Sequence, residues 1–142
     1  KDNIKLLKEL DKTIKIDFFN NSNEIFFNSD KEQLSRTFFN LIKNSIESIQ
    51  QKDEKVNNFN KNITIELNDV SSHIMLTIND NGVGFKNLNK NVKEILNPYF
   101  TTKKNGTGLG LSIVNKIIND HNGNIEFISK NDGAIIKIIF TK

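Results

Sequence analysis

The chain has 142 residues, a length that predicts one domain built around one hydrophobic core. Hydrophobic residues make up 36% and charged residues 26%, which favours a globular soluble fold over a disordered chain, and no apolar run approaches the length of a membrane span. The formal net charge of +3 comes from basic residues scattered among acidic ones, so no nucleic-acid-binding face is indicated, and the absence of cysteine excludes disulfides and thiolate metal sites.

The N-terminal part is predicted to contain one short helix and two strands. Apolar residues at helical spacing indicate an amphipathic helix over residues 3–10, and strict alternation predicts a strand over residues 14–18. The apolar run at residues 25–27 indicates a second, short strand, with residues 20–23 as the turn between the two strands.

A long helix is predicted next, capped by Ser29 or Asp30 and running to about residue 51. Its expected buried stripe consists of Phe38, Leu41, Ile42, Ser45, Ile46 and Ile49. Alternating apolar residues then predict a hairpin, with strands over residues 63–67 and 74–78 and a turn at residues 69–72.

Residues 81–105 show no clean period, and a loop this long is usually functional or mobile. A helix is predicted over residues 109–120, ended by Asn122-Gly123 in a left-handed conformation. Two final strands and the turn between them are predicted at residues 124–129, 134–140 and 131–133. The order predicts an α+β fold: a two-layer α/β sandwich in which a mixed, mainly antiparallel sheet carries helices on one face.

Asn40 and Asn44 are four residues apart and therefore lie on one face of the long helix. Taken alone, this pattern is typical of the solvated side of an amphipathic helix. Amide oxygens are also suitable ligands for a hard cation such as Mg²⁺, which prefers oxygen.

Asp80 ends a strand and opens the sequence Asp80-Asn81-Gly82-Val83-Gly84. One interpretation is a simple turn, because Asn-Gly is a common turn pair. The other is a rigidly held carboxylate that accepts a hydrogen bond from the exocyclic amine of adenine, with glycines that let the ring approach the backbone.

A second glycine-rich sequence, Gly106-Thr107-Gly108-Leu109-Gly110, follows the long loop and opens a helix. It lacks the ending of a Walker loop and does not follow a strand, so both common phosphate motifs are disfavoured. The start of a helix is nevertheless a suitable anion site, and a bare hinge is the alternative. Residues 98–103 precede it, and their threonines and lysine are either phosphate contacts or part of a surface loop.

Four segments resemble, in order and spacing, the sequence boxes of sensor histidine kinases. Residues 40–45 resemble the asparagine box and residues 99–103 the phenylalanine box. Residues 80–84 and 106–110 resemble the two glycine boxes. The residues in these boxes are most similar to those of nitrogen-regulation-type sensors. The resemblance implies the Bergerat fold, an ATP-binding sandwich shared with DNA gyrase B subunits, heat-shock chaperones and mismatch-repair ATPases.

The resemblance also implies a role for individual residues. Asn44 would bind Mg²⁺ with help from Asn40, Asp80 would hold the adenine of ATP, and Gly82 and Gly84 would line the base. The other expected ATP contacts are Phe100, Thr101, Thr102, Lys103, Gly106, Thr107, Gly108, Leu109 and Gly110. Asn40, Asn44 and Lys103 are the residues expected to act in catalysis, and residues 85–105 would form a lid over ATP.

The residue type at position 40 distinguishes the kinases of this superfamily from its ATPases, and here it is Asn40. The related ATPases resemble one another in having a glutamate four residues before the magnesium asparagine, where it activates water. Asn40 occupies that place here, and an amide has no useful basicity, so ATP is expected to survive for phosphoryl transfer. An ATPase and a non-catalytic nucleotide-binding module remain the alternatives.

The chain departs from the family pattern at two places. Glu47 stands where many relatives have lysine, so Lys43 or Lys103 is expected to substitute, and Gly133-Ala134 replaces a frequent Gly-Thr. No phosphoacceptor histidine box is present, and His73 and His121 are expected to be structural.

The chain is therefore expected to be one catalytic domain, residues 1–142, from a longer protein that begins upstream of Lys1. Its expected partners are ATP, a histidine-bearing dimerisation domain of the same protein and a downstream response regulator, with no nucleic acid and no membrane. The isolated domain is expected to be monomeric and cytoplasmic, in a parent protein with or without an anchor in the inner membrane.

Overall fold

A computed structural model of the chain describes residues 2–22, 25, 27–85, 92–100 and 108–142. Its helices are α1 (Asp2–Lys8), α2 (Lys31–Asp53), the 3₁₀ helix η1 (Val92–Leu96) and α3 (Gly110–Asp120). Its strands are β1 (Lys15–Asn20), β2 (Asn62–Val70), β3 (His73–Asp80), β4 (Gly123–Ser129) and β5 (Ala134–Thr141).

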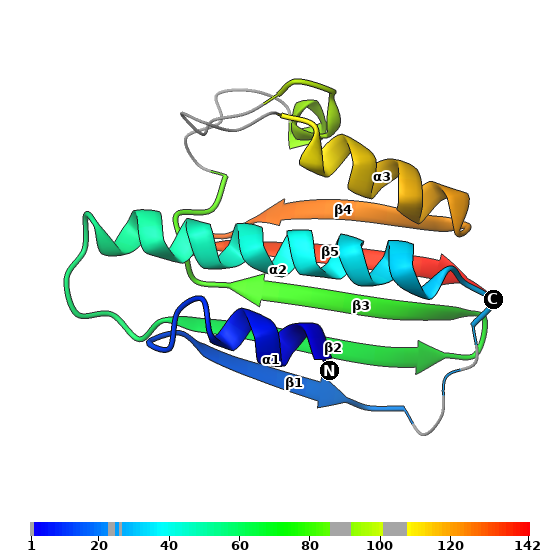
Figure 1. Cartoon of the computed structure of the whole chain (residues 1–142), viewed down its shortest axis with the longest axis horizontal. Helices are drawn as coiled ribbons and strands as arrows, with labels where there is room; N and C mark the ends of the chain where they lie inside the picture. Colours follow the sequence, from blue (N-terminus) through cyan, green and yellow to red (C-terminus); the bar gives the residue numbers. More distant parts are fainter. Residues whose placement is uncertain (1, 23–24, 26, 86–91, 101–107) are drawn as a thin grey trace.

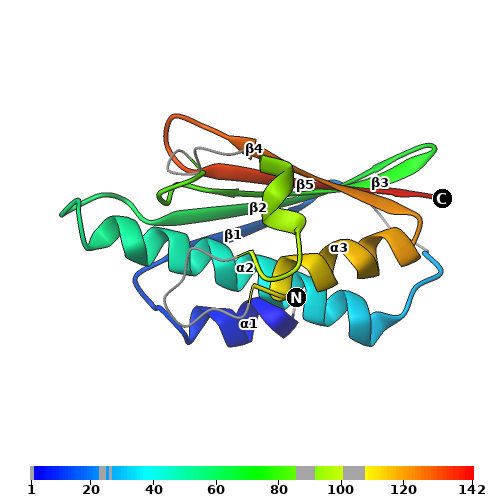
Figure 2. The same ribbon diagram turned by 90° about the horizontal axis from the view of Figure 1, so that it is seen from above.

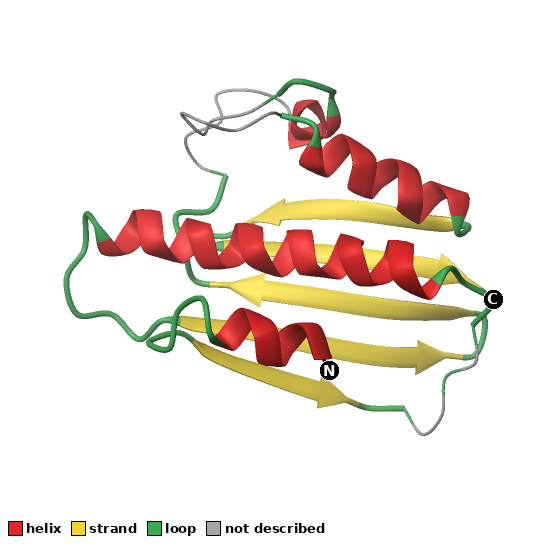
Figure 3. Ribbon diagram, in the orientation of Figure 1, coloured by secondary structure: helices red, strands yellow, loops and turns green. Residues whose placement is uncertain are grey.

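The five strands form one sheet in the order β1-β2-β3-β5-β4. β1 and β2 are parallel and are connected through α2, whereas all other neighbours are antiparallel. Figure 2 shows α1, α2 and α3 together on one side of this sheet, and Figure 3 shows the same two layers by element type. The predicted two-layer α+β sandwich is therefore confirmed.

The strand predicted at residues 25–27 is wrong for the two of its residues that the structure describes. Ile25 and Phe27 have no strand conformation, and β1 pairs in parallel with β2 instead of forming a hairpin with this segment. Both side chains pack against the core, and the Phe27 ring lies 5.0 Å from that of Phe140. Their apolar character therefore serves burial against the core and not a strand ladder.

α2 begins at the predicted cap and ends two residues later than predicted. Oδ1 of Asp30 accepts the backbone N–H groups of Glu32 and Gln33, both at 3.0 Å. The backbone N–H of Gln33 is the main cause that lowers the pKa of the Asp30 carboxyl below its usual range. The N–H of Asp30 itself donates to Nε2 of His121 at 3.0 Å, so His121 has the structural role that was predicted.

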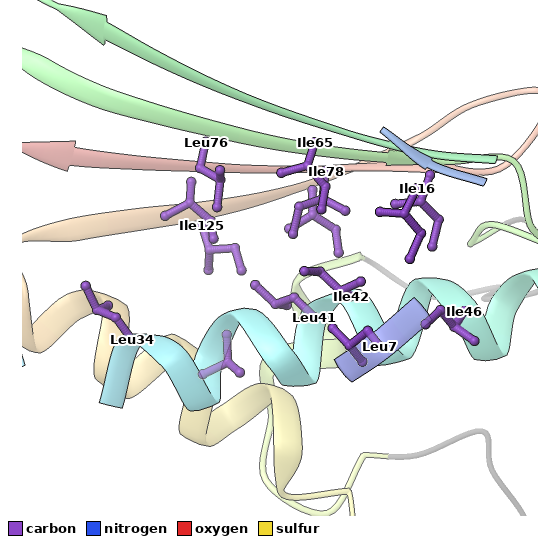
Figure 4. Packing of buried hydrophobic residues seen from close by; sticks show 14 of the residues in the cluster. Leu7, Ile16, Leu34, Leu41, Ile42, Ile46, Ile65, Leu76, Ile78 and Ile125 are labelled. Carbon is purple, nitrogen blue, oxygen red and sulfur yellow. The ribbon is translucent and has the colours of Figure 1, made fainter. Parts of the chain in front are cut away.

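The core lies between the helices and the sheet (Figure 4). Five members of the predicted stripe of α2 are buried, while Phe38 is partly buried. In β3 the buried and partly exposed residues alternate strictly, which places Ile74, Leu76 and Ile78 on the face toward the helices. Asp80 is next in that series, so its side chain is on the same face.

The C-terminal part largely follows the sequence prediction. The predicted irregular segment contains η1, whose Ile95 is buried. α3 ends at Asp120 with His121 as its C-cap, and Asn122 (φ 55°) takes the left-handed conformation alone, whereas Gly123 already begins β4. The turn at residues 131–133 joins β4 to β5 as predicted, with Gly133 at φ 95°.

Candidate functional site

Asp80 is a buried carboxylate at the C-terminal end of β3. Asp80 is 3% exposed. It is one of three buried polar or charged residues among those described, and the other two are Thr37 and Ser45. One carboxylate oxygen, Oδ1, accepts the backbone N–H of Gly82 at 3.0 Å. An ionised carboxylate has about four acceptor positions, so the N–H of Gly82 leaves part of the hydrogen-bonding capacity of this carboxylate for other groups.

Burial is the main cause that raises the pKa of the Asp80 carboxyl above its ordinary value of 3.8. The N–H of Gly82, the hydroxyl of Ser45 and the charge of Lys130 act in the opposite direction. Oγ of Ser45 is itself buried beside the carboxylate, and no described group makes a hydrogen bond of normal geometry with it. Two polar groups with unused hydrogen-bonding capacity thus face the same spot.

The segment after Asp80 lies directly against α2. The N–H of Val83 donates to the carbonyl of Ser48 at 3.2 Å, and a Cβ at Gly82 would overlap the backbone and side chain of Ser48. The contact with the helix is therefore by itself sufficient to require glycine at residue 82.

Gly84 meets the turn between β4 and β5. It has φ +65°, and a Cβ there would overlap the carbonyl oxygen of Gly133. The next residue, Phe85, packs edge to face on Phe127 at 5.8 Å between ring centroids. Both glycines of the first motif are thus fixed by close protein contacts, which the sequence interpretation did not anticipate.

Asn40 and Asn44 lie on α2, and both are partly buried. Asn44 directly precedes Ser45, whose hydroxyl acts on Asp80, so this turn of α2 passes beside the carboxylate. Glu47, one turn later, is 3.9 Å from Nζ of Lys43. The negative charge at this departure from the family pattern is therefore balanced by the lysine that was expected to substitute.

The N-terminus of α3 contrasts with that of α2. Its N-cap residue is Leu109, and no side chain caps it and no acidic residue lies in its first turn. A Cβ at Gly110 would have no heavy atom within 4 Å. Its first N–H groups have no side-chain acceptor in the described part of the chain, and they carry the positive end of the helix dipole.

Gly108, just before α3, lies against the backbone of Tyr99. It has φ +69°, and a Cβ there would overlap the backbone of Tyr99, which has φ 66° itself. Phe100 is partly buried, and its N–H donates to the carbonyl of Asn97 at 3.2 Å. The other predicted contacts, Thr101, Thr102, Lys103, Gly106 and Thr107, lie outside the described residues.

The elements that carry these residues meet at one end of the molecule. In Figure 1 the C-terminal end of β3 and the N-terminal end of α3 point to the same end, and α2 runs alongside both. α3 packs against α2, and η1 packs against α3. The Asp80 carboxylate and the start of α3 thus lie toward the same end of the molecule, and α2, which carries the asparagine pair, packs against α3.

Comparison with known proteins identifies the family. Residues 29–142 match the family described as "Histidine kinase-, DNA gyrase B-, and HSP90-like ATPase". The chain belongs to this family. Its relatives include sporulation kinase C of Bacillus subtilis, which is 30% identical over 122 residues that cover 85% of this chain and 26% of that kinase. The nitrogen regulation protein NtrY of Azorhizobium caulinodans is 36% identical over 104 residues, 73% of this chain and 13% of NtrY, which supports the predicted likeness to nitrogen-regulation-type sensors.

Solved structures support the same assignment. The nucleotide-free catalytic domain of histidine kinase ThkA has a TM-score of 0.82 and 27% sequence identity, and the match covers 99% of this chain and 88% of that one. ThkA has also been solved in complex with the response regulator protein TrrA, where the TM-score is 0.73 at 24% identity. The chain is thus homologous to the ATP-binding catalytic domain of sensor histidine kinases, and it spans about a quarter or less of the first curated relatives it matches.

Sequence reasoning missed two residues that shape the site. Ser45 was expected only in the buried stripe, whereas its hydroxyl lies beside Asp80. Lys52 is in the last turn of α2, where a lysine is usually explained by the helix dipole, but its ammonium binds the carbonyl of Asn81 at 2.8 Å. No local pattern distinguishes such a lysine from a solvated one, because its partners are far away in sequence.

Proposed function

We propose that this chain binds ATP with Mg²⁺ in the region between α2, Asp80 and the N-terminus of α3, and donates the γ-phosphoryl group to a histidine on a separate dimerisation domain. The observation that carries the proposal is the buried, under-used carboxylate of Asp80 in the same region as an uncapped helix N-terminus. The carboxylate suits the adenine amine, and the N–H groups in the first turn of α3 suit phosphate oxygens.

The residues present fit a magnesium ion held mostly by nucleotide and amide oxygens. No group of three or more histidine, cysteine or acidic side chains that could hold a metal occurs among the described residues. Asn44, assisted by Asn40, would supply the protein ligand, and the ion would neutralise charge on the phosphates. Lys103 and the residues of the lid, 85–105, are proposed to close over the triphosphate.

Catalysis by this chain would consist of placement and charge stabilisation. Asp80 fixes the purine, the N–H groups of α3 hold the phosphates, and the line of attack stays open to an incoming imidazole. Asn40 supplies no base that could activate water, so transfer to histidine is favoured over hydrolysis.

The partners and the location follow from this chemistry. The phosphoacceptor histidine would be provided by a dimerisation domain of the same protein, and a response regulator would take the phosphoryl group onward, in line with the complex known for ThkA. The part of the chain that the structure describes has no helix long and apolar enough to span a membrane. Because ATP is the substrate, we place the domain in the cytoplasm, whether or not the parent protein is anchored in the inner membrane.

The experiment is a titration of the purified chain with ATP and Mg²⁺ by calorimetry, followed by transfer from radiolabelled ATP to a histidine-bearing dimerisation domain added in trans. Saturable binding, no self-labelling and acid-labile label on the added domain are expected. Steady release of phosphate without transfer would instead identify an ATPase, and absence of binding would identify a non-catalytic module.

A further inference from the structure

Lys52 is a charged residue whose side chain is only 16% exposed. Its ammonium donates to the carbonyl oxygen of Asn81 at 2.8 Å and pairs with the carboxylate of Asp132. It also lies 4.6 Å from the centroid of the Phe59 ring, within the range of a cation–π contact. A lysine has three N–H donors, and the carbonyl and the carboxylate engage two of them while the ammonium also faces the aromatic ring.

The carbonyl that Lys52 binds is one end of the peptide group that orients Asp80. That group joins Asn81 to Gly82, and its other end is the N–H that donates to Oδ1 of Asp80 at 3.0 Å. A peptide group is planar and rigid, so the directions of its C=O and N–H are fixed together. Rotation of this group would break the contacts of Lys52 and of Asp80 at the same time.

Other contacts of Asn81 and Gly82 hold the chain in place without binding the Asn81 carbonyl; Gly82, for example, lies against Ser48 of α2. The side chain of Asn81 accepts the N–H of Asn62 at 3.0 Å and donates to the carbonyl of Asn60, which ties it to the start of β2. Gly133 lies so close that a Cβ there would overlap Asp80 and Asn81. These contacts hold the chain in position, but in the described residues the Asn81 carbonyl has the Lys52 ammonium as its charged partner.

The ion pair with Asp132 adds a third element to the arrangement. Asp132 lies in the turn between β4 and β5, the turn that Gly84 and Asp80 contact through Gly133. Lys52 therefore connects the end of α2 to both sides of the first glycine motif. A charged group with these three partners, and not the dipole of α2 alone, explains why lysine is buried here.

We propose that Lys52 is a positioning residue for purine recognition: by binding the Asn81 carbonyl it fixes the peptide group whose N–H orients the Asp80 carboxylate. The proposal rests on the proposed function, because it assigns Asp80 to the adenine amine. Lys52 touches no substrate atom, and it acts through Asp80.

The test compares two nucleotides on one scaffold. ATP carries the exocyclic amine, whereas inosine triphosphate carries an oxygen in its place, so the ratio of their dissociation constants isolates the contact with Asp80. Lys52→Met removes the donors and keeps an unbranched apolar chain. It is expected to reduce the preference for ATP by about tenfold while affinity for inosine triphosphate changes little.

The chain offers a matched control in Lys61, whose side chain is 17% exposed. Its ammonium pairs with Asp53 at 2.7 Å and with Thr13, and its side chain contacts neither Asp80 nor the glycine segment. Lys61→Met should lose a comparable buried ion pair and retain the full preference for ATP. A general loosening of the end of α2 would affect both variants equally.

A double-mutant cycle separates positioning from stability. In an Asp80→Ala background Lys52→Met should cause no further loss of ATP affinity, because the group on which Lys52 acts is gone. If Lys52→Met does not fold, Asp132→Asn is the substitute variant, because the Asp132 side chain is 70% exposed and its replacement should not disturb folding. This variant weakens one charge-assisted hydrogen bond of Lys52, so the preference for ATP over inosine triphosphate is expected to fall by about two- to threefold.

The positioning role is overturned if the ratio of the dissociation constants for ATP and inosine triphosphate is unchanged in the folded Lys52 or Asp132 variant. It is also overturned if the losses of ATP affinity in the double-mutant cycle are additive. Either result leaves the proposed function standing. Failure of the unmodified chain to bind ATP, or to distinguish it from inosine triphosphate, removes the proposed function or its adenine contact, and the positioning role with it.

Discussion

Replacing Asp80 with asparagine is expected to make the nucleotide-free domain more stable and to impair ATP binding. The carboxyl is 3% exposed, and burial raises its pKa above 3.8. A folded-state pKa that is raised means that the native state holds the proton more tightly than the unfolded chain does. The ionised carboxylate therefore costs stability at neutral pH, and this cost is absent below the unfolded-state pKa.

The size of the effect follows from the pKa shift and the local contacts. Each unit by which burial raises the pKa corresponds to about 1.4 kcal/mol at neutral pH. Asparagine keeps an oxygen for the N–H of Gly82, and its NH₂ group can donate to the unpartnered Oγ of Ser45. A gain of about 1 kcal/mol raises the melting temperature of a chain of this size by roughly 3–4 °C.

ATP binding should change in the opposite direction. Because the N–H of Gly82 fixes which end of the amide is the oxygen, the NH₂ group of asparagine would take the second acceptor position. An adenine amine at that position would meet a donor instead of an acceptor. The affinity for ATP is expected to fall by about 100-fold, the usual scale for a buried polar group left without its partner.

The assay is thermal unfolding of the nucleotide-free protein as a function of pH, paired with an ATP titration at neutral pH. The stability advantage of Asp80→Asn should shrink as the pH falls through the raised pKa of Asp80 toward 3.8. Asp120→Asn, at a half-exposed carboxylate paired with Lys116 on α3, should show neither the pH-dependent gain nor the loss of ATP binding. A melting temperature of Asp80→Asn below that of the unmodified protein at neutral pH would refute the claim that the buried charge is a cost.

Three further substitutions test separate parts of the site. Gly133→Ala should destabilise the domain by about 1–3 kcal/mol in denaturant unfolding, because φ is +95° and a Cβ would overlap the Asp80 backbone; stability equal to that of the unmodified protein would contradict the contact. Gly110→Ala should leave the fold intact or stabilise it by up to about 1 kcal/mol, because its Cβ meets open space. It should nevertheless lower the affinity for ATP, because the added methyl group would stand where the phosphates are proposed to bind. An unchanged affinity for ATP would show that the phosphates do not bind beside residue 110. Asn40→Glu should raise the release of phosphate from ATP, measured by a coupled assay, because it adds the missing base, and an unchanged rate would show that water is not positioned near residue 40.

Local patterns determined most of the secondary structure. The strict alternation in residues 74–78 and the helical period in residues 38–49 each define one buried face, and both faces are where the patterns predict them. The cap at Asp30 and the turn at residues 131–133 also follow local chemistry, because a side-chain acceptor or an Asp-Gly pair acts within a few residues.

The family was also readable from the sequence, since the asparagine pair and two glycine motifs occur in a fixed order. What the sequence did not reveal was the neighbour of β1. Ile25 and Phe27 look like a strand by composition, but the partner of β1 is β2, which is some forty residues away and becomes adjacent only after α2 has crossed the sheet.

The sequence by itself determined which residue types are present at the site: a carboxylate at a strand end, asparagines four residues apart, and glycines before a helix. Only the tertiary structure decided how the carboxylate is oriented and why the glycines are required. Gly82 packs directly against Ser48, and Gly84 packs against Gly133. The Asn81 carbonyl accepts a hydrogen bond from Lys52. These contacts join segments that are 29 to 49 residues apart, and packing over such separations depends on the complete fold, which no local pattern encodes.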